Sequence, residues 1–300
     1  MARTLWEVKS KRDQILESEK SLLLSKNDFN KYFLSKESET GIQMEQQNVG
    51  DCYLLAAIYA LSISPYFEIM CRSSMKRNSD GSWQVKIPLL NKEGRIINIT
   101  QEELLSSWNK NFLKQHPTGR MVPDLRVKLL PVKAKEGIKV LEAAFIKQKF
   151  GSVNRLSADG GSSHQAILEL CGNNFYPYLV ESFKYDQENK LRSSGLDFIK
   201  GKSEAYLDFF LENFNSGIYI ATAATRLNKK TRSVKFLFPL HSYSISSVDI
   251  KTGMINLVNP INTSQIIRLT IKQFKENFSH LYAVIINETE VLKNINSLEK

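Results

Sequence analysis

The most continuous apolar stretch of the chain is DCYLLAAIYALSI, residues 51–63. It consists largely of good helix formers, and Ser64-Pro65 follows it, a pair that disfavours further helix. The pattern predicts a helix that opens at Cys52. Helical spacing of apolar positions predicts two more helices, over 137–150 and over 163–170.

Runs of β-branched and aromatic residues bounded by turn signals predict strands. Two such runs surround the turn NKEG in the first half, and six follow a predicted helix (202–213) in the second. In chain order they are 82–90, 95–100, 218–222, 233–237, 242–249, 254–258, 266–270 and 280–286.

A helix-rich half therefore precedes a strand-rich half. This segregation predicts an α+β fold of two lobes with a cleft between them. The expected divisions are 1–40, a polar N-terminal arm that is helical or flexible, 41–175, a helical lobe, and 176–300, a β-rich lobe.

Composition narrows the class of protein. The chain has 300 residues, 42% hydrophobic and 24% charged, which is ordinary for a globular protein. It has no run of 18 apolar residues, so no transmembrane segment is expected, and no apolar stretch near the start predicts a Sec signal. Three cysteines without a CxxC pair argue against a disulfide framework or a zinc ribbon and favour a reducing environment.

The net charge of +10 is concentrated in residues 110–149, where ten basic residues face three acidic ones. The basic residues are Lys110, Lys114, Arg120, Arg126, Lys128, Lys133, Lys135, Lys139, Lys147 and Lys149. This stretch suggests a docking surface for an acidic partner or a membrane surface, and the alternative is a solvated helix face. A nucleic-acid partner is not expected, because no aromatic series is interleaved with the basic residues.

Cys52 follows Gly50-Asp51 and lies at the predicted start of a helix. Unpaired backbone N–H groups and the positive end of the helix dipole favour a thiolate there, and a thiolate is the nucleophilic form of cysteine. Gln46 lies six residues upstream, and its amide is a donor of the kind that an oxyanion site needs. The alternative is a small buried hydrophobe, as most cysteines in apolar stretches are.

A partner for such a thiol lies in the second half. His241 opens the alternating run HSYSISSVD, Asn259 ends MINLVN, and Lys251-Thr252-Gly253 lies between the runs as a turn signal. A hairpin would bring His241 and Asn259 close together on neighbouring strands. Asn259 could then hold the imidazole ring and leave the other ring nitrogen for a thiol.

Four segments carry a family resemblance. QQNVGDCYLLAAIYAL, VLEAAFIKQKFGSV with SADGGSSHQAILELCG, HSYSIS and LVNP occur in that order between Gln46 and Pro260. Together they resemble the calpain family of papain-like cysteine proteases. The resemblance implies a papain-like protease core in which a helical lobe presents Cys52 and a strand-rich lobe brings His241 and Asn259.

The resemblance also implies the chemistry. Cys52 and His241 would form an ion pair, and the thiolate would attack a peptide carbonyl to give a thioester acyl-enzyme. Gln46 and the Cys52 backbone N–H would bind the oxyanion, and Asn259 would orient His241. The implied protein is a cysteine endopeptidase acting on protein substrates, without a cofactor.

Some positions depart from the family pattern. Family members have Trp after the Asn-Pro pair, where this chain has Ile261, and Trp after the nucleophile, where it has Tyr53. Two positions that supply acidic calcium ligands in the animal enzymes are Gln43 and Gln165 here. Because Ca²⁺ prefers carboxylate oxygens, we expect a calcium-independent core with no metal site.

Two other functions use the same residues. A papain-like acyl transferase or deamidase would share the triad but differ in its acceptor, and a catalytically latent binding module would keep the fold without the chemistry. For localisation, the hypothesis is a bacterial protein, cytoplasmic as synthesised, that is secreted as an effector into host cells without a Sec signal.

Overall fold

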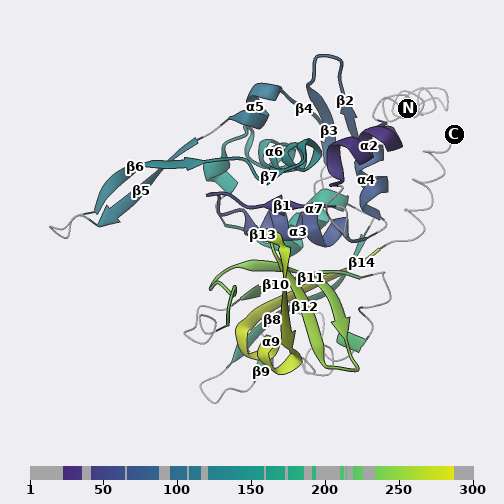
Figure 1. The fold of residues 1–300 in the computed structure, drawn as a ribbon, viewed down its shortest axis with the longest axis vertical. Helices are drawn as coiled ribbons and strands as arrows, with labels where there is room; N and C mark the ends of the chain where they lie inside the picture. The colour runs from purple at the N-terminus through teal and green to yellow at the C-terminus, as the bar shows by residue number, and fades with distance from the viewer. Residues whose placement is uncertain are drawn as a thin grey trace, which may run out of the picture.

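A computed structural model describes residues 23–35, 42–64, 66–87, 95–106, 108–115, 121–158, 160–172, 175–185, 191–193, 210–212, 214, 219–225 and 234–286. It is an α+β structure in which helices gather above a large antiparallel sheet (Figure 1). The helices are α2 (Lys26–Phe33), α3 (Cys52–Ser62), α4 (Tyr66–Ser74), α5 (Gln101–Leu105), α6 (Glu136–Phe150), the 3₁₀ helix η1 (Arg155–Ala158), α7 (Ser163–Cys171) and α9 (Ile271–Asn277).

The large sheet has seven strands within the described residues. Their spatial order is β13 (Asn262–Thr270), β12 (Met254–Asn259), β11 (Ser242–Asp249), β10 (Tyr219–Thr225), β14 (Phe278–Ile286), β8 (Phe175–Tyr185) and β9 (Leu191–Ser193). All neighbouring pairs are antiparallel, so the strands can be joined by short connections such as the turn at 250–253 between β11 and β12.

Smaller sheets surround the helices. Strands β2 (Met75–Arg77), β3 (Trp83–Ile87) and β4 (Arg95–Ile99) form one, and β1 (Met44–Glu45) pairs with β7 (Lys133–Ala134). Strands β5 (Trp108–Gln115) and β6 (Met121–Leu129) form a long two-stranded hairpin that projects from the body (Figure 1).

Alternation along the strands of the large sheet divides the buried residues into two cores. Ile220, Val258 and Val284 face the helices and join the first core, which α3, α6 and α7 build. Their neighbours, such as Ala221 and Leu257, point to the opposite face and join the second core, which α9 covers. Both faces of the sheet are therefore buried, with the helix that opens at Cys52 packed directly on β10 and β11.

Most of the predicted elements are confirmed. The helix predicted over 51–63 is α3, those over 137–150 and 163–170 are α6 and α7, and the strand predicted over 242–249 is β11. Residues Tyr53 to Leu61 of α3 are all buried, which explains why this helix has no polar face. The helix predicted over 202–213 lies largely outside the described residues.

The strand predicted over 233–237 is wrong. The described residues 234–240 form turns, and Phe236 and Leu240 have positive φ values of 69° and 52°. Side-chain hydroxyls take the place of strand partners here. The Tyr243 hydroxyl donates to the Phe236 carbonyl at 3.1 Å, and Thr225 Oγ1 donates to the Phe238 carbonyl at 2.6 Å.

The helix-face alternative for the basic stretch is also wrong for residues 108–115 and 121–129, because they form the paired strands β5 and β6, with Lys114 opposite Val122. In the remaining part, three lysines form ion pairs with other elements. Lys133 pairs with Glu45 at 2.9 Å, Lys147 with Glu103 at 2.6 Å and Lys149 with Glu169 at 2.9 Å.

The predicted N-terminal arm contains a core element. Helix α2 begins with Ser25 as an N-cap, whose hydroxyl oxygen accepts from the Asp28 N–H at 3.1 Å. Its Phe29 and Phe33 are buried and stack on each other at 5.0 Å within the first core. Residues 23–35 are thus part of the packed body.

None of the described helices alone has the length and apolar character needed to cross a membrane. Helices α3 and α4 meet that criterion only when taken together, and they bend by 110° at their junction.

Candidate active site

Cys52 is the first residue of α3 and is partly buried. The helix starts there because the Asp51 carbonyl accepts from the Leu54 and Leu55 N–H groups, at 2.8 and 3.1 Å. Burial raises the pKa of the Cys52 thiol, and the backbone and side chain of the neighbouring Ser242 oppose this rise. Cys52 therefore contacts the residue that directly follows His241.

Two serines hold β11 against α3. Ser242 contacts Cys52, and Ser244 Oγ donates to the Ala56 carbonyl at 2.7 Å in a buried position. Between these two contacts β11 advances by two residues, about 6.6 Å, and α3 by four residues, about 6.0 Å, so both contacts can form at once. The two contacts fix the position of His241 along the axis of α3.

The prediction that His241 and Asn259 come together is confirmed. Strands β11 and β12 form the expected hairpin, with Ser244 opposite Val258, and His241 Nε2 lies 2.9 Å from Asn259 Oδ1. Both residues are buried. The cross-strand register contains a bulge between Ile245 and Ser247.

Asn259 fixes the protonation of the imidazole. Its Oδ1 also accepts the Ile261 backbone N–H at 2.9 Å, which can only donate, so the amide orientation is determined. Because Oδ1 can only accept, His241 Nε2 must carry a proton. In the neutral ring, Nδ1 is then the basic nitrogen, the one that a thiol proton would reach.

The His241 ring is held on several sides. Phe238 and Tyr243 lie edge-on to it, at 5.9 and 5.0 Å between ring centres. The His241 backbone N–H donates to Thr225 Oγ1 at 3.0 Å, and its carbonyl accepts the Thr225 N–H at 3.0 Å. Ile261 is 37% exposed and donates its backbone N–H to Asn259 Oδ1.

Burial shifts both reactive groups toward their neutral forms. It raises the pKa of the Cys52 thiol and lowers the pKa of His241, an effect that the Asn259 hydrogen bond opposes. Each charge alone is therefore disfavoured. A proton transfer from thiol to imidazole would create both charges together and keep the site neutral, and the attraction between these opposite charges favours it.

The lowered pKa of His241 predicts a pH dependence of stability. The unfolded chain binds a proton near pH 6.5 that the folded imidazole resists, so stability is complete above this pH and falls below it. We expect wild-type protein to lose up to about 1.4 kcal/mol per pH unit more than His241→Gln below pH 6.5, in urea titrations. Equal losses would contradict this, since the half-buried His164, whose pKa burial also lowers, is present in both proteins.

Gln46 connects the loop before α3 to the sheet. Its backbone N–H donates to the Pro260 carbonyl at 2.8 Å. Its side-chain Nε2 donates to the Val49 carbonyl at 2.6 Å and to Asp51 Oδ1 at 3.2 Å. Both amide N–H bonds are thus used within the loop, so the predicted oxyanion contact requires the substrate to replace one of them, and the longer bond to Asp51 is the weaker candidate.

The Gly160-Gly161 pair packs against the loop before α3. Gly160 has a φ of +86°, and its N–H donates to the Gly50 carbonyl at 2.8 Å. A Cβ on Gly161 would lie 2.6 Å from the Tyr53 ring. Glycine is therefore required where this loop crosses the residue that follows Cys52.

Gly161→Ala tests this packing. We expect a loss of about 1–3 kcal/mol in unfolding free energy, together with a changed rate of Cys52 alkylation, because Tyr53 must move. Gly137→Ala is the matched control, since its Cβ would lie 2.4 Å from the Phe33 ring, elsewhere in the first core. An unchanged alkylation rate in Gly161→Ala would show that the contact does not reach the thiol.

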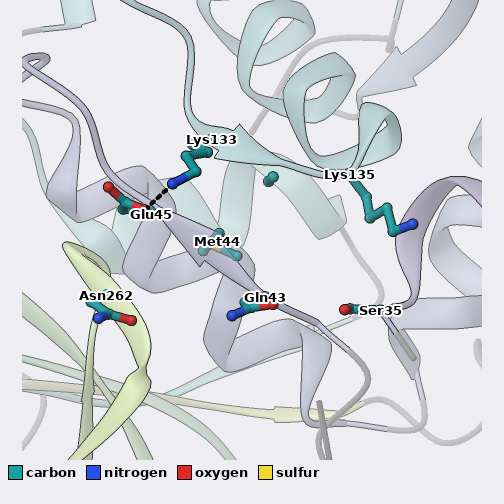
Figure 2. Close-up of a pocket in the computed structure, with 8 residues that line it drawn as sticks. Ser35, Gln43, Met44, Glu45, Lys133, Lys135 and Asn262 are labelled. Carbon is teal, nitrogen blue, oxygen red and sulfur yellow. Dashed lines mark hydrogen bonds and ion pairs between the residues drawn. The ribbon is translucent and has the colours of Figure 1, made fainter. Parts of the chain in front are cut away.

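A surface pocket of about 290 Å³ is lined by Glu45 and Asn262, the sequence neighbours of Gln46 and Ile261 (Figure 2). The Lys133–Glu45 ion pair lies at one end and Ser35 with Lys135 at the other, as Figure 2 shows. The walls come from β1, β7 and β13, and the pocket also includes Gln43, Met44, Ala134 and Asn262. It is a place where a chain extending from the site could lie.

The two positions considered for calcium have other surroundings. Gln43 lines this pocket, and Gln165 donates from Nε2 to Glu169 at 2.6 Å. Within the described ranges, no three His, Cys, Asp or Glu side chains come together in a way that could hold a metal ion.

Two features of the site were not identified from the sequence. One is Ser242, whose position directly after His241 on the same strand was the available signal. The other is the buried set of Asp51, Glu142 and Arg155 behind Cys52, for which no local pattern exists, because its members lie 91 and 13 positions apart.

Comparisons with protein-family models and with curated proteins found no match to this chain.

Proposed function

We propose that this protein is a calpain-like cysteine endopeptidase with a papain-like core, in which Cys52 is the nucleophile, His241 the acid and base, and Asn259 the residue that orients the imidazole. The observation that carries the proposal is the joint arrangement of the three. Asn259 fixes His241 with Nδ1 as the basic nitrogen, while Ser242, the next residue, lies beside Cys52 and opposes the rise of its pKa.

Acylation follows from this arrangement. The Cys52 thiol gives its proton to His241 Nδ1, and the sulfur attacks the substrate carbonyl carbon, forming the C–S bond. The oxygen takes up the negative charge near the Cys52 backbone N–H and the Gln46 amide. The imidazolium then protonates the leaving amine nitrogen, and the C–N bond breaks.

Deacylation reverses the roles. Water loses a proton to His241 Nδ1 as its oxygen attacks the thioester carbonyl. The C–S bond then breaks, the sulfur regains the proton, and the carboxylic acid leaves. Throughout, Asn259 Oδ1 accepts from the Nε2 proton, which never leaves the ring.

Direct bonds between the nucleophile segment and the sheet support a site that is assembled without calcium. Gln46 N–H donates to the Pro260 carbonyl, and Thr263 Oγ1 accepts the Met44 N–H at 2.9 Å and contacts the Met44 carbonyl at 3.0 Å. A further buried contact joins Ser163 on α7 to Thr222 on β10 at 2.7 Å.

The test is labelling with an epoxide electrophile, mapped by mass spectrometry, in calcium and in excess chelator. We expect fast labelling of Cys52 in both conditions, and slow labelling of Cys71 and Cys171, which are fully buried. Labelling of Cys52 only with calcium would overturn calcium independence. Labelling no faster than that of Cys71 would favour a latent binding module.

The β5–β6 hairpin remains the candidate docking element for an acidic partner or a membrane surface. Its two strands carry Lys110, Lys114, Arg126 and Lys128 against Asp124. Its projection from the body supports this proposal, because a projecting arm can reach a partner beyond the site (Figure 1).

A further inference from the structure

Behind the nucleophile lies a buried charged cluster, formed by Asp51, Glu142 of α6 and Arg155 of η1. Their exposed fractions are 1%, 0% and 0%. Arg155 donates to Glu142 Oε2 at 3.4 Å, and both Glu142 oxygens lie 3.3 Å from the Val132 N–H. The other end of the guanidinium donates to the Ser106 carbonyl at 2.9 Å.

Asp51 occupies the N-cap position of α3 but does not cap the helix with its side chain. This is unusual, since Asp is among the preferred N-cap residues. Its Oδ1 instead accepts from Gln46 Nε2, and its Oδ2 is buried without a hydrogen-bond donor among the described residues. The charge of the neighbouring Glu142 carboxyl group and its contact with the Asp51 side chain both raise the pKa of Asp51.

Two buried carboxyl groups in contact, with one guanidinium for both, cannot both be ionised at low cost. A proton on Asp51 Oδ2, donated to Glu142, satisfies the unpartnered oxygen and leaves one carboxylate for Arg155. The cluster is then neutral. We propose that Asp51 is a positioning residue that keeps its carboxyl proton at neutral pH and donates it to Glu142. Its Oδ1 then holds the Gln46 amide as a neutral acceptor, and the start of α3 carries no charge.

The charge state of Asp51 matters to both reactive neighbours. An ionised Asp51 would raise the pKa of the Cys52 thiol and oppose thiolate formation. It would also hold the Gln46 amide by a charge-assisted bond, about twice as strong as a neutral one, and keep that amide from a substrate. A protonated Asp51 leaves the thiol unopposed and the amide easily released.

The largest influences on Asp51 favour the proton. Burial and the adjacent carboxylate of Glu142 raise the pKa of Asp51 well above the usual carboxyl value, and Arg155 opposes them with a smaller effect. From α3 itself, the titratable neighbours are Cys52 and Tyr53, whose pKa values Asp51 raises when ionised.

The first test compares wild type with Asp51→Asn, whose amide reproduces a protonated carboxyl group without a titratable proton. The readout is the rate of Cys52 alkylation by iodoacetamide between pH 5 and pH 9. We expect rates within about threefold at pH 7, and a faster variant at any higher pH that ionises Asp51 of the wild type. A more than tenfold slower variant at pH 7 would overturn the proposal, because it would show that the ionised carboxylate is needed.

The second test uses stability. A carboxyl group that is protonated in the folded state and ionised in the unfolded state makes the folded protein less stable as pH rises above about 4, the pKa of the group in the unfolded chain. The unfolding constant of wild type should therefore rise about tenfold per pH unit relative to that of Asp51→Asn, until the native carboxyl group ionises. Parallel curves would overturn the proposal. Asp249→Asn is the control, since Asp249 is exposed and its pKa is lowered by Thr252.

If Asp51→Asn does not fold, the wild type alone decides. Its infrared spectrum at neutral pH should contain the carbonyl stretch of a buried protonated carboxyl group, and absence of that band would overturn the proposal. Although the role of the proton rests on the proposed function, none of these readouts needs a substrate. If the protein cleaves no substrate but the buried carboxyl proton is detected, only the proposed protease function is contradicted. If it cleaves substrate and no such proton is detected, only this inference is contradicted.

Discussion

Replacing Cys52 with alanine is expected to lower the rate of peptide cleavage by roughly 10⁴-fold or more, with the fold unchanged. The sulfur is the atom that forms the acyl-enzyme, and nothing in α3 can replace it. Because Cys52 is only partly buried, at the first residue of α3 beside Ser242, truncating its side chain removes little packing. The measurement is kcat/KM on a peptide library, with circular dichroism to verify folding.

Cys71→Ala is the matched control. Cys71 is fully buried in α4, and burial raises the pKa of its thiol well above the usual value, so it cannot supply a nucleophile. We expect its variant to keep the wild-type cleavage rate after allowance for any loss of stability. Equal cleavage by wild type and Cys52→Ala would remove Cys52 from the mechanism.

The mass of the product separates the rival functions, with Cys52→Ala as the comparison. An endopeptidase gives new chain termini, whereas a deamidase shifts a glutamine by about one mass unit and an acyl transferase joins the acyl group to an amine, all through the same thioester. A binding module would retain its partner in Cys52→Ala and would form no product in the wild type.

Replacing Arg155 with methionine is expected to lower the free energy of unfolding at pH 7 by about 3–5 kcal/mol. Arg155 and Glu142 are both fully buried, so the change leaves a carboxylate without its cation in a medium that solvates it poorly. Urea unfolding should show a lower midpoint with an unchanged slope.

Two comparisons make this prediction sharp. The double variant Glu142→Gln, Arg155→Met should recover part of the loss, because no unpaired charge remains. Arg72→Ala removes an ion pair of 3.1 Å with Glu68 in which both side chains are partly exposed, and should cost only about 0–1 kcal/mol. A loss for Arg155→Met as small as that for Arg72→Ala would mean that water reaches the cluster.

Local pattern predicted the elements that fold by short-range rules. The apolar run after Cys52 became α3 within a residue of its predicted ends, and the alternation after His241 became β11. The proximity of His241 and Asn259 was also predictable, because a hairpin with a short turn constrains which strand ends meet.

Other features depend on partners far away in the chain. Residues 234–237 carry strand-forming side chains, but hydroxyls of Thr225 and Tyr243 hold the segment 234–240 as turns. Phe29 and Phe33 look like part of a polar arm in sequence, yet they fill a gap in the first core beside Phe67.

The sequence by itself determined the α+β class, most of the helices and strands, and which cysteine, histidine and asparagine are the candidates for chemistry. Only the tertiary structure decided that Ser242 lies beside Cys52, that both amide N–H bonds of Gln46 are used inside its own loop, and that Asp51 faces Glu142 instead of capping α3. The physical reason is range. Periodicity and turn chemistry act over a few residues, whereas protonation and hydrogen-bond choice depend on which groups are buried together, and burial joins residues that the chain keeps far apart.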